Sequence, residues 1–355
     1  MQINMKDKAV ESLDFPKFFA GRIDKMEFIK LYNLTTIDNL FENFPDFPQS
    51  APRLKRLELI LSEGSDRWKG REDPFALISI PTAIDHLLLE RIPLYPSFLA
   101  LRNLKYLELK DSSFSHPDGN ILLDLLEKNQ LLETVKLDFK SEKLNIRPSL
   151  FSEKINLNNV SQLVVTSEIP GAVESLISKI NPPNRGRLKI TAPHKSNLNK
   201  IFSSMEDFLE QSPPDRMHFE GMRKVKFSGP NRTFVFRGPD GSISFKNFPL
   251  YLLEEVRSLS ISKLSPLKLV PSHFPALEVL FIQEDQETLS HVLSLFLLHP
   301  ELSPKLKTIT FEGCDPPKDL FEELEKFAMR KKEANMPFSC VEIRKGRKRK
   351  SSNIS

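Results

Sequence analysis

Cysteine and histidine are the residues of this chain best suited to bind a metal or attack a substrate, and they are few. The 355 residues include two cysteines, Cys314 and Cys340, and seven histidines. Structural zinc sites need cysteine and histidine ligands at short, regular spacings, and these residues have none. The histidines are His86, His116, His194, His218, His273, His291 and His299. We predict no metal site and no cofactor, and interpret the histidines as structural or surface residues.

The motifs of common catalytic sites are also missing from the sequence. It contains no G-x-x-x-x-G-K-[ST], G-x-G-x-x-G, G-x-S-x-G or H-E-x-x-H motif, which removes the usual signals for phosphate, dinucleotide, hydrolase and zinc-protease sites. Neither cysteine lies in a nucleophile motif, and two cysteines are too few for a disulfide framework. We predict that the protein is not an enzyme. An enzyme with an unrecognised site is a remote alternative.

Charge is concentrated in one short run near the C-terminus. The formal net charge is +4, and this run supplies enough cations to leave the rest of the chain nearly neutral, unlike a basic nucleic-acid-binding domain. The run consists of Arg344, Lys345, Arg347, Lys348, Arg349 and Lys350. It is a candidate nuclear-import signal or a contact for an acidic surface. The alternative is a solubilising tail without a fixed role.

Membrane and secretion signals are not found. No run of about 18 apolar residues occurs, and the N-terminal residues lack the continuous apolar stretch of a signal peptide. We therefore expect no membrane partner and an intracellular location, cytoplasmic, nuclear or both.

A recurring pattern of leucines predicts the strands that would position any binding residues. The segment Leu101–Asp111, LRNLKYLELKD, places Leu104, Leu107 and Leu109 in the pattern L-x-x-L-x-L, typical of a strand with one buried face. The pattern recurs along the chain at intervals mostly near the about 20–29 residues of leucine-rich repeats. Its middle apolar residues are Met26, Leu57, Leu87, Leu107, Val135, Leu163, Leu188, Val225, Leu259, Leu280, Ile309 and Val341.

Segments between these strands favour helices and one hairpin. Helical spacing predicts helices near 37–44, 120–128, 170–180, 196–209 and 317–332. The alternating runs Thr233–Phe236 and Ser242–Phe245 flank Gly238–Gly241, which predicts an antiparallel hairpin insertion at about 228–250. A final strand is expected at Cys340–Ile343.

We therefore predict an α/β leucine-rich-repeat solenoid, a horseshoe or arc with a parallel concave sheet, helical outer returns and the hairpin insertion. Stacking lets each unit bury an apolar side that it cannot bury alone. The predicted domains are an N-terminal cap or lead-in at 1–22, the solenoid at 23–343 and a disordered basic tail at 344–355.

Three stretches resemble the leucine-rich-repeat region of fungal F-box proteins, especially those of mushroom-forming fungi. They are SAPRLKRLEL at 50–59, the segment Leu101–Phe139, and the ending with FAMRKK at 327–332 and VEIR at 341–344. The late hairpin insertion is a further similarity. The resemblance implies substrate recognition for a cullin-type ubiquitin ligase that is joined through a Skp adaptor.

The sequence departs from that family at its start. The family has an F-box of roughly fifty residues before its repeats, whereas only about twenty residues precede Ile23 here, without a Leu-Pro-x-Glu opening. We expect either a fragment or a relative without an F-box, so Skp is a partner only if an F-box is missing from this sequence. The alternative function is a stand-alone scaffold or regulatory binding protein with no ubiquitin-ligase link.

Candidate binding residues lie between the leucines, on the predicted concave face, where solenoids commonly bind extended partners. They are Arg56, Glu58, His86, Leu88, Tyr106, Glu108, Lys136, Lys189, Lys226, Val279 and Phe281. The charged members could instead form a solvated face. Leu88, Tyr106, Val279 and Phe281 are more informative, because exposed apolar groups favour a partner, although the insertion or a terminal segment could cover them. We expect a protein partner there and regard nucleic acid as unlikely.

Overall fold

The computed structural model shows an α/β fold dominated by parallel strands, as predicted. The chain divides into two compact units, Met1–Asn197 and Leu198–Ser355, each described below by itself. The structure describes residues 2–4, 25–34, 51–62, 73, 80–111, 120–139, 154–169, 171–182, 186–192, 198–210, 213–220, 224–230, 232–237, 248–262, 271–283, 299–312 and 318–344.

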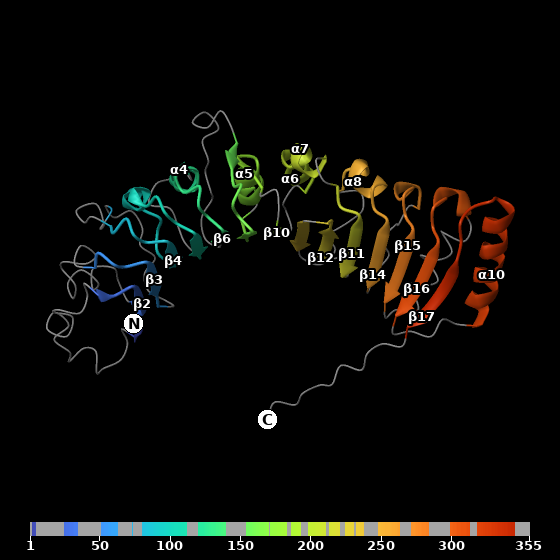
Figure 1. Cartoon of the computed structure of the whole chain (residues 1–355), viewed down its shortest axis with the longest axis horizontal. Helices are drawn as coiled ribbons and strands as arrows, with labels where there is room; N and C mark the ends of the chain where they lie inside the picture. The colour runs from blue at the N-terminus through green and yellow to red at the C-terminus, as the bar shows by residue number, and fades with distance from the viewer. Residues whose placement is uncertain are drawn as a thin grey trace, which may run out of the picture. The chain divides into compact units, whose positions relative to one another are not determined.

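The first unit contains a row of parallel strands (Figure 1). In spatial order they are β1 (Gln2–Asn4), β2 (Phe28–Leu34), β3 (Arg56–Leu61), β4 (His86–Glu90), β5 (Tyr106–Lys110), β6 (Thr134–Phe139), β8 (Gln162–Ser167) and β10 (Gly186–Thr191). β1 pairs with β2 and lies in the segment predicted to be a cap or lead-in. From β2 onward, strands that follow one another in this row are joined by a return along the chain.

The predicted leucine register is confirmed over most of this unit. Leu57 pairs with Leu87, which pairs with Leu107, and all three side chains are buried. The first repeat was placed three residues too early, because Ile29 rather than Met26 pairs with Leu57. Since Met26, Ile29 and Leu31 also satisfy the L-x-x-L-x-L template, side-chain type alone did not decide between the two placements.

A carbonyl group accepts two backbone hydrogen bonds at the entrance to successive strands. The Glu27 carbonyl accepts from the N–H groups of Lys55 and Arg56, and the Lys55 carbonyl accepts from those of Asp85 and His86. Residues at this position alternate in charge, and the Nζ of Lys55 lies 3.4 Å from the Glu27 carboxylate. The series, called here the entry ladder, is Glu27, Lys55, Asp85, Lys105 and Glu133 in the first unit, and Asp215, Arg257 and Glu278 in the second. The carbonyls of Ser161 and Lys307 accept one such bond each, from the N–H groups of Arg187 and Ser339.

Helical returns cover one face of the first unit's strands (Figure 1). They include η2 (Pro96–Ala100), α4 (Asn120–Lys128) and α5 (Ala172–Ile177), and the short strands β7 (Ile155–Asn156) and β9 (Ile180–Asn181) pair with each other. The helix predicted at 120–128 is confirmed, and the one predicted at 170–180 is present but shorter, since Ile180 begins β9. The helix predicted at 37–44 lies outside the described residues. We call the opposite face of the strands the outward face.

The second unit begins with α6 (Leu198–Ser204) and α7 (Glu206–Glu210), which confirm the predicted 196–209 helix as two shorter ones. Its strands run in the spatial order β13 (Arg232–Arg237), β12 (Lys224–Ser228), β11 (Arg216–Glu220), β14 (Ser258–Ser262), β15 (Val279–Gln283), β16 (Thr308–Glu312) and β17 (Cys340–Arg344). The short helices α8 (Leu250–Glu254), η5 (Pro271–His273) and η6 (Pro300–Leu302) lie in its returns.

An antiparallel insertion is present in this unit, and β13 confirms the predicted strand Thr233–Phe236, but its described antiparallel partner is β12. β12 pairs antiparallel with both β11 and β13, so the repeat placed on Val225 is wrong. Met217 on β11 takes that position, since it pairs in parallel with Leu259. Alternation of apolar residues does not reveal strand direction, which explains the error. The predicted hairpin turn and the run Ser242–Phe245 lie outside the described residues.

Aromatic residues fill the core beneath the insertion. Phe202 of α6 contacts Phe236 of β13 and Phe248, with ring centroids 4.8 and 5.2 Å apart. Phe227 of β12 contacts Phe248 at 5.3 Å. These edge-on and tilted contacts are the favourable geometries of aromatic pairs, and they fix the inner face of the antiparallel strands.

The end of the second unit combines a long helix with the last strand. α10 (Lys318–Glu333) confirms the helix predicted at 317–332, and β17 confirms the final strand. Lys331 of α10 is fully buried and donates a hydrogen bond to the Ser303 carbonyl. Arg344, predicted to open the disordered tail, is instead the last residue of β17 and pairs with Glu312.

Candidate functional site

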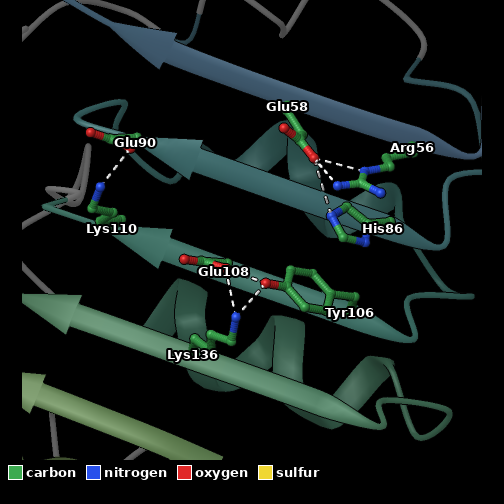
Figure 2. A network of polar contacts seen from close by, with 8 residues as sticks. All are labelled: Arg56, Glu58, His86, Glu90, Tyr106, Glu108, Lys110 and Lys136. Atoms are coloured by element: carbon green, nitrogen blue, oxygen red, sulfur yellow. Dashed lines mark hydrogen bonds and ion pairs between the residues drawn. The ribbon is translucent and has the colours of Figure 1, made fainter. Parts of the chain in front are cut away.

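The outward face of the first unit brings several predicted binding residues into rows. In-register pairing places Arg56, His86 and Tyr106 side by side in one row. The next row contains Glu58, Leu88, Glu108, Lys136, Val164 and Lys189. We define the platform as the following side chains in these two rows: Arg56, Glu58, His86, Leu88, Tyr106, Glu108 and Lys136. Figure 2 shows all of them except Leu88.

Glu58 is the buried centre of the platform, with only 2% of its side chain exposed. Its Oε1 accepts a hydrogen bond from the Nε of Arg56 at 2.7 Å, and its Oε2 lies 3.1 Å from the Nζ of Lys30. Burial would raise the pKa of this carboxyl, but the hydrogen bonds and positive charges of Arg56 and Lys30 outweigh burial and lower the pKa. Glu58 therefore orders its neighbours instead of offering a free carboxylate to a partner.

His86 and Tyr106 form the aromatic part of the platform. Their rings stack with centroids 4.0 Å apart and planes inclined by 4°. The Nε2 of His86 lies 3.7 Å from the Glu58 carboxylate. Burial lowers the pKa of His86, and the positive charge of Arg56 lowers it further, against the opposing effect of Glu58. His86 is therefore mainly neutral near pH 7, and its ring provides a flat, weakly polar surface.

Tyr106, Glu108 and Lys136 form a closed triangle on the same face (Figure 2). The Tyr106 hydroxyl donates to the Glu108 carboxylate, and the Nζ of Lys136 donates to the Tyr106 hydroxyl at 2.8 Å and to Glu108 at 3.2 Å. Burial raises the pKa of Tyr106, and the bond to Glu108 raises it further. The bond to Tyr106 raises the pKa of Lys136. The hydroxyl stays protonated and the ammonium charged, so the triangle is fixed near neutral pH.

A further ion-pair group extends the platform and was not predicted. The Nζ of Lys110 lies 3.0 Å from Glu90, and so does a guanidinium nitrogen of Arg91. Arg91 has a positive φ of 61° and also donates to the Leu61 carbonyl at 2.9 Å. The sequence could have indicated this group by position, because Glu90 and Lys110 each lie two residues beyond a second-row residue on the same strand.

Other predicted binding residues lie elsewhere. Val279 and Phe281 lie on β15 of the second unit, half-buried. Lys226 is exposed on the antiparallel strand β12 rather than on a parallel one. Lys189, on β10, is half-buried in the first unit. Arg344 belongs to β17, whereas the import candidates Lys345, Arg347, Lys348, Arg349 and Lys350 lie outside the described residues.

A serine–histidine contact in the second unit was missed by the sequence analysis. The Nδ1 of His218 lies 2.8 Å from the Oγ of Ser260 on the neighbouring strand. A base beside a hydroxyl is one part of a nucleophilic site, but acyl transfer also needs donors aimed at the developing oxyanion. The carboxylate two residues away, Glu220, accepts a hydrogen bond from Lys224. We interpret the contact as a cross-strand hydrogen bond that orients His218.

Among the residues that the structure describes, no three His, Cys, Asp or Glu side chains gather as metal ligands do. None of the described helices is both long enough and apolar enough to cross a membrane.

The architecture at the candidate site is thus a parallel sheet with helical returns on one face and ordered aromatic and charged side chains on the other. No family model, curated protein or solved structure matches this chain.

Proposed function

We propose that this chain is a non-enzymatic recognition module of the leucine-rich-repeat type, which binds a protein partner on the outward face of its parallel strands. The observation that carries the proposal is the ordered platform, in which cross-strand contacts fix side chains of different chemistry in one surface. Side chains that are already immobile lose little entropy on binding. This is an advantage for recognition.

Half-exposed apolar and aromatic groups give the platform its binding potential. Leu88 lies between Glu58 and Glu108 in the second row, and it is half-buried next to the His86–Tyr106 stack. Tyrosine is among the residues that contribute most to protein interfaces. The surrounding ion pairs supply a polar rim that would exclude water around such a centre.

Site-specific photocrosslinking tests this function. A photoreactive phenylalanine analogue at position 88 should produce a discrete crosslinked species with a cellular protein. The same analogue at position 329 is the matched control, because Met329 on α10 is 66% exposed and far from the platform strands in sequence. Adding Tyr106→Ala should reduce the crosslink at position 88 if folding is retained. Equal crosslinking at both positions, or none at position 88, would contradict the proposal.

The proposed role in a ubiquitin ligase rests on the resemblance to fungal F-box proteins. Co-purification of Skp adaptor with the full reading frame, including any coding sequence upstream of Met1, tests it. Without Skp binding, a stand-alone scaffold or regulatory binding protein is the better description, and the photocrosslinking result is unaffected. We expect an intracellular location in either case.

A further inference from the structure

The antiparallel insertion presents a row of cations on its outward face. In β12, Lys224 lies opposite Glu220 on one side and Arg237 on the other. Lys226 lies between His218 and Val235 in the same way. Since their neighbours Val225 and Phe227 are buried, the lysines belong to the opposite face. We call Arg216, Lys224, Lys226 and Arg237 the insertion patch.

Positive charge on this patch is only partly compensated. Lys224 donates to Glu220, and the Nε of Arg216 lies 3.9 Å from Asp215. Lys226 and Arg237 are exposed, and neither forms a hydrogen bond or close ion pair with another residue that the structure describes. Burial lowers the pKa of His218, the negative charge of Glu220 opposes this shift, and the charges of Lys224 and Lys226 add to it. The cations of the patch without a close carboxylate partner among the described residues are thus Lys226 and Arg237.

The platform of the first unit has a different charge arrangement. There, Lys30 pairs with Glu58 at 3.1 Å and Lys136 with Glu108 at 3.2 Å. Lys110 likewise pairs with Glu90. Each of these lysines is thus paired with a carboxylate, whereas Lys226 and Arg237 of the insertion patch have no such close partner among the described residues and are available to bind an anionic group.

Strand geometry favours an extended acidic peptide as that ligand. Lys224 and Lys226 are two residues apart on one strand, which separates their Cα atoms by roughly 6–7 Å, and carboxylates on alternate residues of an extended peptide have the same period. Single-stranded nucleic acid would need aromatic side chains for base stacking. The outward positions of β11, β12 and β13 contain no Phe, Tyr or Trp.

We propose that the insertion patch binds an acidic, extended segment of a protein partner. Complementary charge brings the segment to the patch, and Lys226 and Arg237 are its principal contacts. The inference is independent of partner binding at the platform, because it concerns other strands and another chemistry. Binding through exposed charges weakens as salt is added.

Fluorescence anisotropy with a defined probe tests the inference. The probe is a short fluorescein-labelled peptide in which glutamate alternates with serine, and its control has glutamine in place of glutamate. The full chain is used with Lys345, Arg347, Lys348, Arg349 and Lys350 changed to glutamine, so that the basic tail does not contribute. We expect binding of the glutamate probe, weak or no binding of the glutamine probe, and loss of binding at raised salt.

Matched charge reversals locate the contact. Lys226→Glu with Arg237→Glu should weaken binding by about tenfold or more. Lys326→Glu with Lys332→Glu alters two exposed cations of α10 by the same charge and should leave binding unchanged. If the first pair fails to fold, as judged by circular dichroism, Lys226→Ala with Arg237→Ala replaces it. Equal losses in patch and control variants, absence of glutamate-specific binding, or tighter binding of a single-stranded oligonucleotide would overturn the proposal.

Discussion

His86 and Tyr106 lie on neighbouring parallel strands with their rings stacked, the centroids 4.0 Å apart and the planes inclined by 4°. The stack joins two charged groups of the platform, since His86 adjoins Glu58 and the Tyr106 hydroxyl bonds to Glu108 and Lys136. One ring pair thus connects the buried carboxylate of Glu58 to the ordered ammonium group of Lys136 across four neighbouring strands, β3 to β6.

Substitutions at Tyr106 separate the contribution of the ring from that of the hydroxyl. Tyr106→Phe keeps the stack but removes the bonds to Glu108 and Lys136, and we expect a loss of about 0.5–1.5 kcal/mol. Tyr106→Ala also removes the stack and should cost about 1–1.5 kcal/mol more. Urea unfolding measures both values. Equal losses for the two variants would show that stacking contributes nothing.

Glu58 should make the stability of the first unit sensitive to acid. Its pKa is lowered in the folded protein because the bonds to Arg56 and Lys30 outweigh the effect of burial. The stabilisation is therefore complete above the ordinary value of 4.5 and is lost as the pH falls through the lower folded pKa. Glu58→Gln should be less stable by about 1–2 kcal/mol at neutral pH.

Urea unfolding of wild type and Glu58→Gln between neutral and acidic pH tests this effect. The difference between the two proteins should shrink as the solution becomes more acidic. A difference that does not change with pH would mean that the Glu58 charge has no stabilising role, and that the loss comes from altered packing.

Lys331 should make stability depend on pH in the alkaline range. Burial lowers its pKa to about 8, because the ammonium is removed from water and only the Ser303 carbonyl accepts a hydrogen bond from it among its described contacts. The unfolded chain binds this proton more tightly, so stability rises as the pH increases from near 8 toward the unfolded pKa of 10.5. Lys331→Met should stabilise the protein at neutral pH by about 1–2 kcal/mol.

Thermal unfolding at neutral and mildly alkaline pH measures this prediction. Wild type should gain stability with pH relative to Lys331→Met. Lys332→Met, at the exposed neighbouring position, is the control and should change neither quantity. Destabilisation by Lys331→Met at neutral pH would show that its hydrogen bond outweighs the cost of burial.

Two glycines with positive φ offer a matched pair of substitutions. A Cβ at Gly186 would collide with the backbone carbonyl of Ser161, and its φ is +111°. Gly171 has a φ of +83° with open space around the same position. We expect about 1–2 kcal/mol of lost stability for Gly171→Ala, from backbone strain alone, and a clearly larger loss for Gly186→Ala. Chemical denaturation compares them, and equal losses would contradict the predicted collision.

The repeating leucines allowed most of the strand register to be predicted. Leu57, Leu87 and Leu107 share one pattern and one buried face, because alternation along a strand fixes which side chains turn inward. The direction of each strand and the exact residues of each repeat were harder to predict from the sequence. Apolar and polar residues alternate around Val225 as they do on the parallel strands, but its strand is antiparallel. Met26 fits the repeat position that Ile29 occupies in the structure.

The sequence predicted which residues of the candidate site face outward, but not which of them contact one another. Alternation placed Glu58 on the outward face, yet its burial depends on Arg56 beside it and on Lys30, which is 28 positions earlier in the sequence. The same holds for Lys136 and Tyr106, which meet only through the pairing of β5 and β6. Contacts between strands arise from pairing geometry, which a single sequence does not encode locally.

The entry ladder restricts how this architecture can gain or lose repeats. Its charges alternate from Glu27 to Lys55, Asp85 and Lys105, so excising the single repeat that carries Asp85 would place Lys55 beside Lys105. Excising the repeats of both Asp85 and Lys105 would place Lys55 beside Glu133 and keep opposite charges adjacent. Adding or removing two repeats of this unit at a time should therefore be tolerated better than adding or removing one. Duplication or redesign of the unit should follow the same rule.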